Sequence, residues 1–284
     1  MADFPAYFAV IGHPVGHSLS PVMHLAAFRS LGINACYTGY DVEPERLREV
    51  ASAMRTLHFR GFNVTIPHKS AIMDLLDECT PEAVRIGAVN TVYVKDNRWI
   101  GDNTDGLGYL SSLTHELDFD VRGKRVMIFG AGGAARGIAD ALLFAGIDAL
   151  WIVNRHLDKA TYLAEQLAMH HISQISVLEA GTWPEVQIDL LINTTPVGMQ
   201  GHLAEELPIA TDYLNERMVV SDIVYRPMVT PLLTVAAKVG ARTHGGLGML
   251  VEQGALAFYR WFGVMPPVSV MREAALEAMQ RERT

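Results

Sequence analysis

The chain has 284 residues, of which half are hydrophobic and 19% are charged, and it carries a formal net charge of -8. This balance supports a full buried core and excludes a disordered chain. The acidic net charge also argues against a nucleic acid or an anionic lipid surface as partner. Because typical domains hold about 100 to 150 residues, the length predicts two domains.

Nothing in the sequence predicts secretion or membrane insertion. Residues 1–7 carry no positive charge, and the apolar run at 8–11 is too short for the core of a signal peptide. The most apolar stretch, 139–153, contains two aspartates and is shorter than the roughly 20 residues that span a bilayer. We therefore expect a cytoplasmic protein. The cysteines Cys36 and Cys79 lack the spacing of a metal site and are expected to be free thiols.

The first third of the chain alternates segments typical of strands with segments typical of helices. Short runs rich in β-branched and aromatic residues predict the strands, and helical spacing or an opening proline predicts the helices. In chain order these are a strand at 7–11, a helix at 21–31, strand 35–42, helix 44–54, strand 61–66, helix 69–76 and strand 91–94. The alternation predicts an open parallel or mixed α/β sheet covered by helices.

A polar, turn-prone stretch at 101–108 leads through a further helix to a different pattern. Strands at 125–129, 149–153, 175–178, 190–193 and 219–222 now alternate with helices at 135–145 and 159–169. This order predicts a doubly wound, Rossmann-like domain. Two more helices, at 249–262 and 268–279, are expected to return to the first domain. The predicted division is a substrate-binding domain at 1–106 plus 241–284 and a dinucleotide-binding domain at 107–240.

The second domain opens with a strand that runs into a glycine turn and a helix, with the pattern GxGxxA at 130–135. Gly130 permits the tight turn, Gly132 lets a pyrophosphate approach the backbone, and the small Ala135 lets helix and strand pack closely. The helix N-terminus adds about half a positive charge that faces the anion. A plain structural turn is the alternative for such a motif in isolation. The surrounding βαβ pattern favours a dinucleotide site.

The end of the next strand predicts which dinucleotide is bound. NAD sites carry an acidic residue there, about 20 positions after the glycine turn, for the ribose 2'-hydroxyl. This sequence has Asn154 and Arg155 instead. A carboxylate would repel a 2'-phosphate, whereas a guanidinium makes a charge-assisted contact with it, so NADP is favoured. Lys159 is either a second cation for the phosphate or an ordinary exposed helix lysine.

Polar residues suited to alcohol chemistry gather in the first domain. Oxidation of a secondary alcohol to a carbonyl requires a group that removes the hydroxyl proton and groups that bind hydroxyls. Asn63, Thr65 and Lys69 follow a strand end, where open α/β sheets bind their ligands. Asp105 would orient the lysine ammonium, and Asn90 would add a further polar contact. The alternatives are a turn for Asp105, a capping side chain for Asn90 and a solvated surface charge for a lone lysine.

Two serines precede the first predicted helix. Ser18 and Ser20 are one residue apart, and Pro21 opens the helix. Their hydroxyls and the helix dipole together would bind a carboxylate, although Ser20 would equally serve as a helix cap. His68 borders the site and is interpreted as a flanking residue rather than the base. The substrate inferred from these residues is an acid that carries several hydroxyls.

The motifs resemble one enzyme family over essentially the whole chain. In sequence order they are HSLSP, NVTIPHK, GAVNT, DNTDG, GAGGAARG, NR, NTTPVGM, DIVYRP and GMLVEQGA. Their order and spacing are similar to those of shikimate dehydrogenases. The resemblance implies a family that interconverts 3-dehydroshikimate and shikimate, with NADP as cofactor, in aromatic amino-acid biosynthesis.

The resemblance also implies roles for individual residues. The implied catalytic pair is Lys69 and Asp105, and the implied substrate contacts are Ser18, Ser20, Asn63, Thr65, Lys69, Asn90, Asp105, Tyr225 and Gln253. The implied cofactor contacts are Gly130, Ala131, Gly132, Gly133, Ala134, Asn154, Arg155, Lys159, Thr194, Val224, Gly246 and Met249. Without the resemblance, Tyr225 reads as a core or turn aromatic and Gln253 as a surface helix residue. One departure is His156, where the family commonly has threonine, and it puts the individual cofactor contacts in doubt more than NADP itself.

Three other functions are weighed against this one. A quinate or dual quinate/shikimate dehydrogenase would share most of the site, and Arg155 argues against the NAD-linked versions. A catalytically silent relative would have lost Lys69 or Asp105, and both are present. A metal-dependent dehydrogenase is disfavoured because the histidines form no ligand motif. The expected partner is a small-molecule substrate, and the expected assembly is a monomer or a homodimer.

Overall fold

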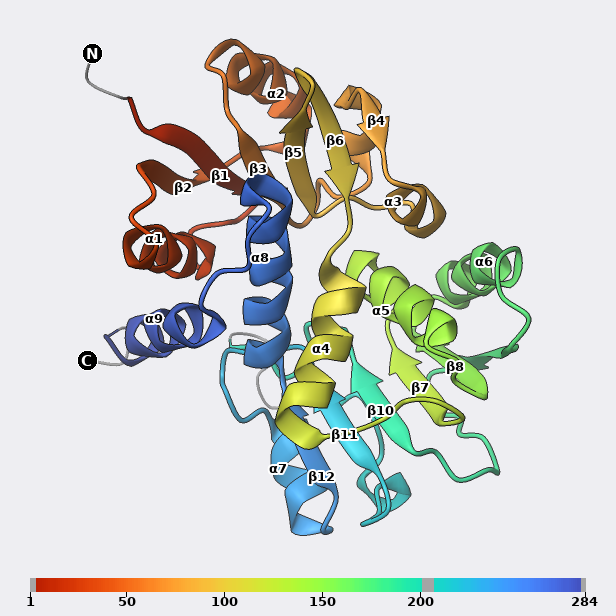
Figure 1. Cartoon of the computed structure of the whole chain (residues 1–284). Helices are drawn as coiled ribbons and strands as arrows, with labels where there is room; N and C mark the ends of the chain where they lie inside the picture. The colour runs from red at the N-terminus through yellow and green to blue at the C-terminus, as the bar shows by residue number, and fades with distance from the viewer. Residues whose placement is uncertain (1–3, 201–206, 282–284) are drawn as a thin grey trace. The chain divides into compact units, whose positions relative to one another are not determined.

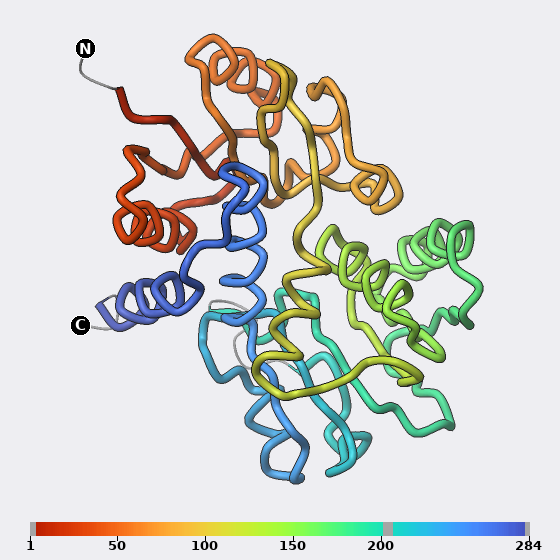
Figure 2. Tube along the Cα trace, viewed as in Figure 1, coloured from red at the N-terminus to blue at the C-terminus, as the bar shows by residue number. Residues whose placement is uncertain are grey.

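The structure is a computed structural model that describes residues 4–200 and 207–281. The chain forms two compact units, one made of Met1–Thr104 and Val251–Thr284 and the other of Asp105–Leu250. Figure 2 follows the trace from the first unit into the second and back through the blue C-terminal segment. Each unit contains one six-stranded sheet. Within the described ranges, no helix is both long enough and apolar enough to cross a membrane.

The first unit is built on a mixed sheet with the strand order β2-β1-β3-β5-β6-β4 (Figure 1). Its strands are β1 (Ala6–Gly12), β2 (Ala35–Asp41), β3 (Gly61–Val64), β4 (Glu78–Cys79), β5 (Thr91–Lys95) and β6 (Arg98–Asp102). The strands β2 and β3 pair with β1 in parallel, whereas β5 pairs antiparallel with β3 and with β6. The carboxyl ends of β1 and β3 therefore lie side by side, and the polar motifs begin there.

Helices and short 3-10 turns cover this sheet. They are α1 (Ser20–Ser30), η1 (Pro44–Arg46), α2 (Leu47–Thr56), η2 (Ala71–Leu75), α3 (Pro81–Ile86), most of α8 (Gly246–Phe262) and α9 (Val268–Arg281). The helix α9 packs on α1. The end of α8 is fixed to the sheet by two contacts. The Trp261 indole donates a hydrogen bond to the Val92 carbonyl (3.0 Å), and the Arg260 guanidinium donates one to the buried Asp102 carboxylate (2.6 Å).

A histidine lies in the aromatic core between α1 and α8. His24 has no exposed surface, and its ring stacks on Tyr37 with ring centroids 4.5 Å apart. Its other ring neighbours include Phe28, Phe258 and Trp261. Burial disfavours the charged imidazolium and lowers the pKa of His24 from 6.5 to about 3. The residue is therefore a neutral core side chain at neutral pH.

The His24→Phe variant is expected to resist acid better than the parent. A folded-state pKa below the unfolded one stabilises the native state above pH 6.5, and this contribution is lost as the pH falls toward 3. The parent should lose unfolding free energy relative to the variant at about 1.4 kcal/mol per pH unit over the upper part of this window. Denaturant unfolding of both proteins from pH 7 to pH 4 measures the difference. If the unfolding free energies of the parent and the variant changed with pH in the same way, a buried, neutral His24 would be contradicted.

The second unit is built on a parallel sheet with the order β12-β11-β10-β7-β8-β9. Its strands are β7 (Arg125–Phe129), β8 (Ala149–Asn154), β9 (Gln174–Glu179), β10 (Leu190–Asn193), β11 (Val219–Asp222) and β12 (Arg242–Gly245). Every neighbouring pair is parallel. Its helices are α4 (Asp105–Leu117), α5 (Gly133–Phe144), α6 (Leu157–Ala168), η3 (Thr211–Tyr213), α7 (Pro231–Lys238) and the first turn of α8. The predicted doubly wound α/β class is confirmed.

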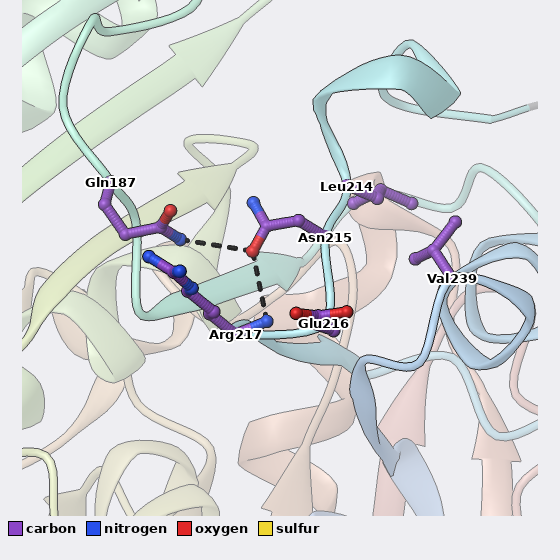
Figure 3. Close-up of a pocket in the computed structure, with 6 residues that line it drawn as sticks. All are labelled: Gln187, Leu214, Asn215, Glu216, Arg217 and Val239. Carbon is purple, nitrogen blue, oxygen red and sulfur yellow. Dashed lines mark hydrogen bonds between the residues drawn. The ribbon is translucent and has the colours of Figure 1, made fainter.

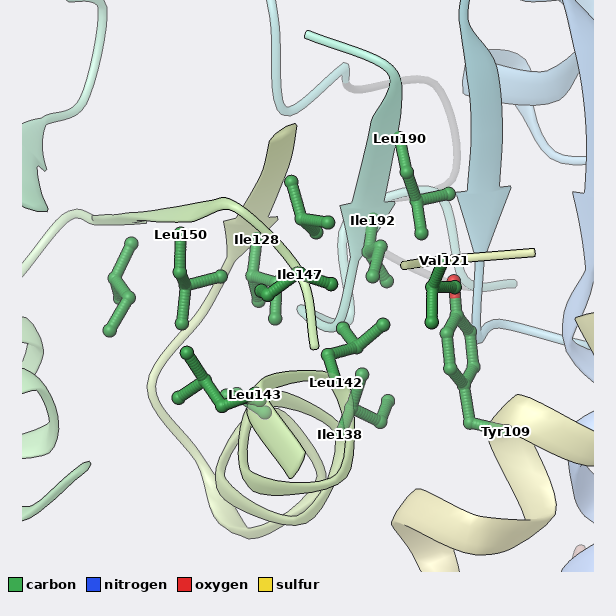
Figure 4. Close-up of a cluster of buried hydrophobic side chains, with 14 of the residues drawn as sticks. Tyr109, Val121, Ile128, Ile138, Leu142, Leu143, Ile147, Leu150, Leu190 and Ile192 are labelled. Carbon is green, nitrogen blue, oxygen red and sulfur yellow. The ribbon is translucent and has the colours of Figure 1, made fainter. Parts of the chain in front are cut away.

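Alternate residues of the central strands pack into two separate hydrophobic clusters, because successive side chains of a strand point to opposite faces of the sheet. On β7, Ile128 faces one cluster and Met127 the other. Figure 4 shows Ile138 and Leu142 of α5 directed toward Ile128 and its neighbours on the sheet. Both faces of the sheet are buried, which accounts for the nearly continuous apolar runs that predicted these strands.

The structure corrects several sequence-based predictions. The segment 69–76 forms only the 3-10 turn η2 rather than a helix, and the polar stretch at 101–108 contains the end of β6 and the start of α4. The elements β4, α3, β6, η3, α7 and β12 were not predicted. The placement of 241–250 in the first domain is wrong for β12, because this strand pairs with β11 in the second sheet.

Candidate active site

The serine motif lies at the start of α1. Ser20 is the first residue of this helix and is buried, while Ser18 is half-buried. The Ser18 hydroxyl accepts a hydrogen bond from the Ser20 backbone N–H (3.3 Å). The helix N-cap is Leu19, so the alternative in which the Ser20 side chain caps α1 is not observed. Two hydroxyls therefore stand at a helix N-terminus, where an anion is favoured.

The lysine motif follows β3 directly. The Thr65 N–H donates a hydrogen bond to the Ile11 carbonyl (2.9 Å), which joins this turn to the end of β1. The buried His68 ring donates a hydrogen bond from Nε2 to the Val42 carbonyl (2.7 Å), so His68 has a structural role here. The Lys69 carbonyl accepts from the Val89 N–H (2.7 Å), so the lysine backbone is fixed beside Asn90 while its side chain is half-buried.

Asn90 is the centre of a buried hydrogen-bond network. Its Oδ1 accepts from the Thr104 N–H (2.9 Å) and the Thr91 hydroxyl (2.9 Å). Its Nδ2 donates to the Thr104 hydroxyl (3.0 Å) and to Gln253 Oε1 (3.3 Å). The Asn90 side chain therefore joins β5, the segment after β6 and helix α8. The capping role considered for this residue is not what the structure shows.

A second polar side chain extends the network toward β2. The Tyr37 hydroxyl donates to Asn63 Oδ1 (2.7 Å), and Asn63 Nδ2 donates to the Asn90 carbonyl (3.2 Å) and the Thr91 hydroxyl (3.2 Å). Burial raises the pKa of Tyr37 well above its ordinary value, so this hydroxyl stays a donor. The Ser20 side chain acts in the opposite direction on the pKa of Tyr37, so the serine motif lies close to the same network. Three polar residues of the network, Tyr37, Thr91 and Thr104, were not predicted.

The second unit gathers the predicted cofactor residues along one edge of its sheet. Across the strands, Val153, Phe129, Asn193, Asp222 and Gly245 lie in one row of register. The residues predicted to bind the cofactor follow these positions or lie next to them, namely the turn at 130–134, Asn154, Arg155, Thr194, Val224 and Gly246. They therefore share the carboxyl edge of a parallel sheet, where ligands bind in this architecture.

The glycine turn has the open geometry that a pyrophosphate needs. Gly130 has a φ of 109°, in the region that glycine tolerates best, and the Thr194 hydroxyl donates to the Phe129 carbonyl beside it (2.6 Å). Gly132 is the N-cap of α5, and a Cβ built there meets no described heavy atom within 4 Å. Gly133 and Ala134 form the first turn of α5, two residues earlier than predicted. The turn thus leaves open space in front of a helix N-terminus.

The remaining residues that were predicted to bind the cofactor differ in exposure. Asn154 Nδ2 donates to the His156 carbonyl (2.8 Å), which shapes the turn that presents Arg155 to solvent. Lys159 is also exposed, on the first turns of α6. Gly246 packs so closely on the Ile223 carbonyl that any Cβ would collide with it. Met249 is buried in the core cluster of this unit.

A pocket of about 420 Å³ lies at the opposite edge of the same sheet. Its lining residues precede strands rather than follow them, and Figure 3 shows Gln187 directed toward Asn215, close to Arg217. Gln187 Nε2 donates to Asn215 Oδ1 (3.4 Å), and the Arg217 N–H donates to the same oxygen (3.1 Å). This pocket therefore lies at the amino edge, away from the glycine turn.

Comparison with known proteins decides the family. The model for the shikimate dehydrogenase substrate binding domain matches residues 10–92, and the model for shikimate/quinate 5-dehydrogenase matches residues 112–197. The model for the shikimate 5'-dehydrogenase C-terminal domain matches residues 246–276. The shikimate dehydrogenase (NADP(+)) of Geobacillus sp. strain WCH70 is 44% identical over 96% of this chain and 98% of its own length. The chain belongs to the shikimate dehydrogenase family.

Solved structures of this family share the fold. Shikimate 5-dehydrogenase from Thermus thermophilus, in complex with NADP(H) and shikimate, superposes with a TM-score of 0.87 at 39% identity, covering 96% of this chain and 99% of that one. Quinate dehydrogenase from Corynebacterium glutamicum, in complex with NAD, superposes with a TM-score of 0.88 at 30% identity, covering 97% and 100%. The shikimate dehydrogenase fold is therefore shared with an enzyme named for another substrate and solved with another cofactor.

Proposed function

We propose that this chain is an NADP-dependent shikimate dehydrogenase, which reduces 3-dehydroshikimate to shikimate reversibly in the pathway to chorismate. The observation that carries the proposal is the carboxyl edge of the second sheet. An open glycine turn stands there beside Arg155, with no acidic residue at the end of β8. The relatives named above support the same cofactor and the same substrate.

The residues of the second unit fit NADP. The backbone N–H groups at the start of α5 would bind the pyrophosphate, with Gly130 to Ala134 in van der Waals contact. Arg155, aided by Lys159, would bind the 2'-phosphate, and Asn154 would hold the turn between them. Thr194, Val224, Gly246 and Met249 would surround the nicotinamide half. The bound NADPH supplies a hydride to the substrate carbonyl carbon.

The residues of the first unit fit a hydroxylated ring acid. The Ser18 and Ser20 hydroxyls would hold the carboxylate at the N-terminus of α1. Asn63, Thr65, Asn90 and Gln253 would contact ring hydroxyls, and we assign a further contact to Tyr225. In this assignment the Asn90 network keeps Asn63 and Gln253 at fixed positions before the substrate enters. Such preorganisation lowers the cost of binding a polar ring.

Lys69 and Asp105 are the proposed catalytic pair. In the reduction, the Lys69 ammonium would donate a proton to the carbonyl oxygen as it becomes the alcohol, and in the oxidation it would take this proton back. Asp105 would accept a hydrogen bond from the ammonium and orient it, and would contact a ring hydroxyl. Asp105 is the first residue of α4 and is buried, so its position is well defined rather than that of a loose turn.

The direct test is product identification. Purified protein with 3-dehydroshikimate and NADPH should consume the two in equal amounts and form shikimate, which chromatography against an authentic standard identifies. Consumption of NADPH without formation of shikimate would contradict the proposal.

We also expect, from the sequence, a cytoplasmic enzyme that works as a monomer or a homodimer. Both cysteines are free thiols, as predicted.

A further inference from the structure

Two polar residues end the neighbouring strands β10 and β11. Asn193 and Asp222 are partners in the parallel register, and neither has any exposed surface. Asn193 Nδ2 donates a hydrogen bond to Asp222 Oδ1 at 3.0 Å. Buried polar groups are costly unless their hydrogen bonds are satisfied, so such a pair at a strand end calls for an explanation.

Asn193 organises the loop that follows β10. Its Oδ1 accepts from the Thr195 N–H (3.0 Å) and the Thr195 hydroxyl (2.7 Å). Its Nδ2 donates to the Val197 carbonyl (3.1 Å) as well as to Asp222. A carboxamide offers two donors and two acceptor sites, and all of them are used within the protein. Asn193 therefore has no hydrogen-bonding capacity left for a ligand.

Asp222 organises the loop that follows β11. Its Oδ1 accepts from the Val224 N–H (3.1 Å), and its Oδ2 accepts from the Thr230 hydroxyl (2.7 Å). Thr230 in turn caps α7 by accepting a hydrogen bond from the Leu233 N–H (3.3 Å). One carboxylate thus fixes both ends of the segment 224–230. Burial raises the pKa of Asp222 to about 6, against the hydrogen bonds from Thr230, Val224 and Asn193, which lower it.

We propose that the Asn193–Asp222 pair positions the nicotinamide half of NADP, by holding the two loops that carry Thr194, Val224 and Tyr225. This inference rests on the proposed function. The nearest proposed cofactor residues are one position beyond Asn193 and two positions beyond Asp222. Each polar atom of the pair is bonded within the protein, and neither residue has any exposed surface to offer the ligand. The pair acts through its loops. The adenosine half would bind at the ends of β7 and β8, in the other half of the doubly wound sheet.

The chemistry of the pair predicts that Asp222→Asn disrupts the contact with Thr230 but leaves the bond from Asn193 in place. An amide oxygen can still accept from Asn193 and from Val224. The new NH₂ group, however, would face the Thr230 hydroxyl, which donates a hydrogen bond to Asp222 in the parent. The contact that fixes the far end of the loop is therefore lost or reversed. Thr230→Val removes the same contact from the other side, whereas Thr230→Ser keeps it.

The experiment compares a whole cofactor with one of its halves. Dissociation constants for NADPH and for adenosine 2',5'-bisphosphate are measured by calorimetry on the parent, Asp222→Asn, Thr230→Val, Thr230→Ser and the control Thr234→Val. Thr234 lies on the same helix and bonds the Thr230 carbonyl, not the carboxylate. We expect NADPH to bind about tenfold or more weakly to Asp222→Asn, and at least threefold more weakly to Thr230→Val, as for loss of a hydrogen bond to a charged group. The fragment should bind all five proteins equally within about twofold.

The outcomes separate the two proposals. Equal weakening of NADPH and the fragment would overturn the positioning role, because the pair would then support only the domain as a whole. Unchanged NADPH binding to Asp222→Asn would overturn it as well, and so would a loss with Thr230→Ser as large as that with Thr230→Val. If the parent binds neither NADPH nor the fragment, the proposed cofactor itself is wrong, and this inference falls with it.

Discussion

Replacing Lys69 with alanine is expected to lower kcat by about a hundredfold or more in both directions of the reaction. This is the scale of rate lost when a positioned proton donor is removed. The Michaelis constant for NADP should change little, because Lys69 belongs to the first unit and the proposed cofactor residues to the second. The fold should survive, since the backbone carbonyl of residue 69 keeps its hydrogen bond from the Val89 N–H in the variant. Steady-state kinetics with purified variants measures the effect.

Lys95→Ala is the matched control for this variant. Lys95 is an exposed lysine at the end of β5 in the same unit, outside the polar network. It should keep the turnover of the parent. The melting temperatures of both variants should lie close to that of the parent. A Lys69→Ala enzyme with near-normal kcat would show that another group transfers the proton.

The second large effect is expected on cofactor choice. Arg155→Ala should raise the Michaelis constant for NADP by about 10- to 100-fold, because a hydrogen bond to a charged group contributes about 1.5 to 3 kcal/mol. The constant for NAD should stay nearly unchanged, since NAD lacks the 2'-phosphate. The ratio of kcat/KM values for the two cofactors is therefore the quantity to compare.

Arg122→Ala provides the control for Arg155. Arg122 is an exposed arginine paired with Asp120 just before β7, at the amino edge of the same sheet. Its removal tests whether loss of any positive charge weakens NADP binding through the overall field. Equal effects of the two variants, or an unchanged preference in Arg155→Ala, would rule out a specific contact between Arg155 and the 2'-phosphate.

The second unit was the easier part to predict from the sequence. The strands β7, β8 and β10 are buried on both faces, so their apolar runs stand out, and the glycine turn follows at fixed spacing. β12 was missed because its four residues are largely polar. His244 is nevertheless buried there, because Ser112 and Ser221 satisfy its two ring nitrogens at 3.1 and 2.9 Å. No local pattern in the sequence indicates such partners, which are far away in the chain.

In the site, too, residues within short motifs could be predicted, whereas residues brought together by strand pairing could not. The motifs around Asn63, Lys69 and Asn90 are short and continuous, so they could be singled out before any fold was known. Tyr37 could not, because it lies in an ordinary strand pattern and meets Asn63 only through the pairing of β2, β1 and β3. Thr91 lies in the motif GAVNT and Thr104 in the motif DNTDG. Both motifs could be recognised in the sequence, but the family resemblance assigned roles only to the neighbouring residues.

The network around Asn90 explains why a long helix from the end of the chain belongs to the first unit. Gln253 reaches Asn90 from α8, and Arg260 and Trp261 fix the same helix to β6 and β5. Asp102 is almost fully buried, so its pairing with Arg260 avoids an uncompensated charge next to the segment that carries Thr104. Sequence periodicity predicted the helix. The polar contacts that place it required the structure.

The most direct test of the proposed function is a set of initial rates with shikimate and quinate, each paired with NADP and with NAD. We expect efficient oxidation of shikimate with NADP. The kcat/KM values with NAD should be at least tenfold lower, because NAD lacks the contact to the 2'-phosphate, and quinate should be the slower substrate with either cofactor. Comparable rates with quinate or with NAD would contradict this account and would place the chain with the dual-specificity enzymes.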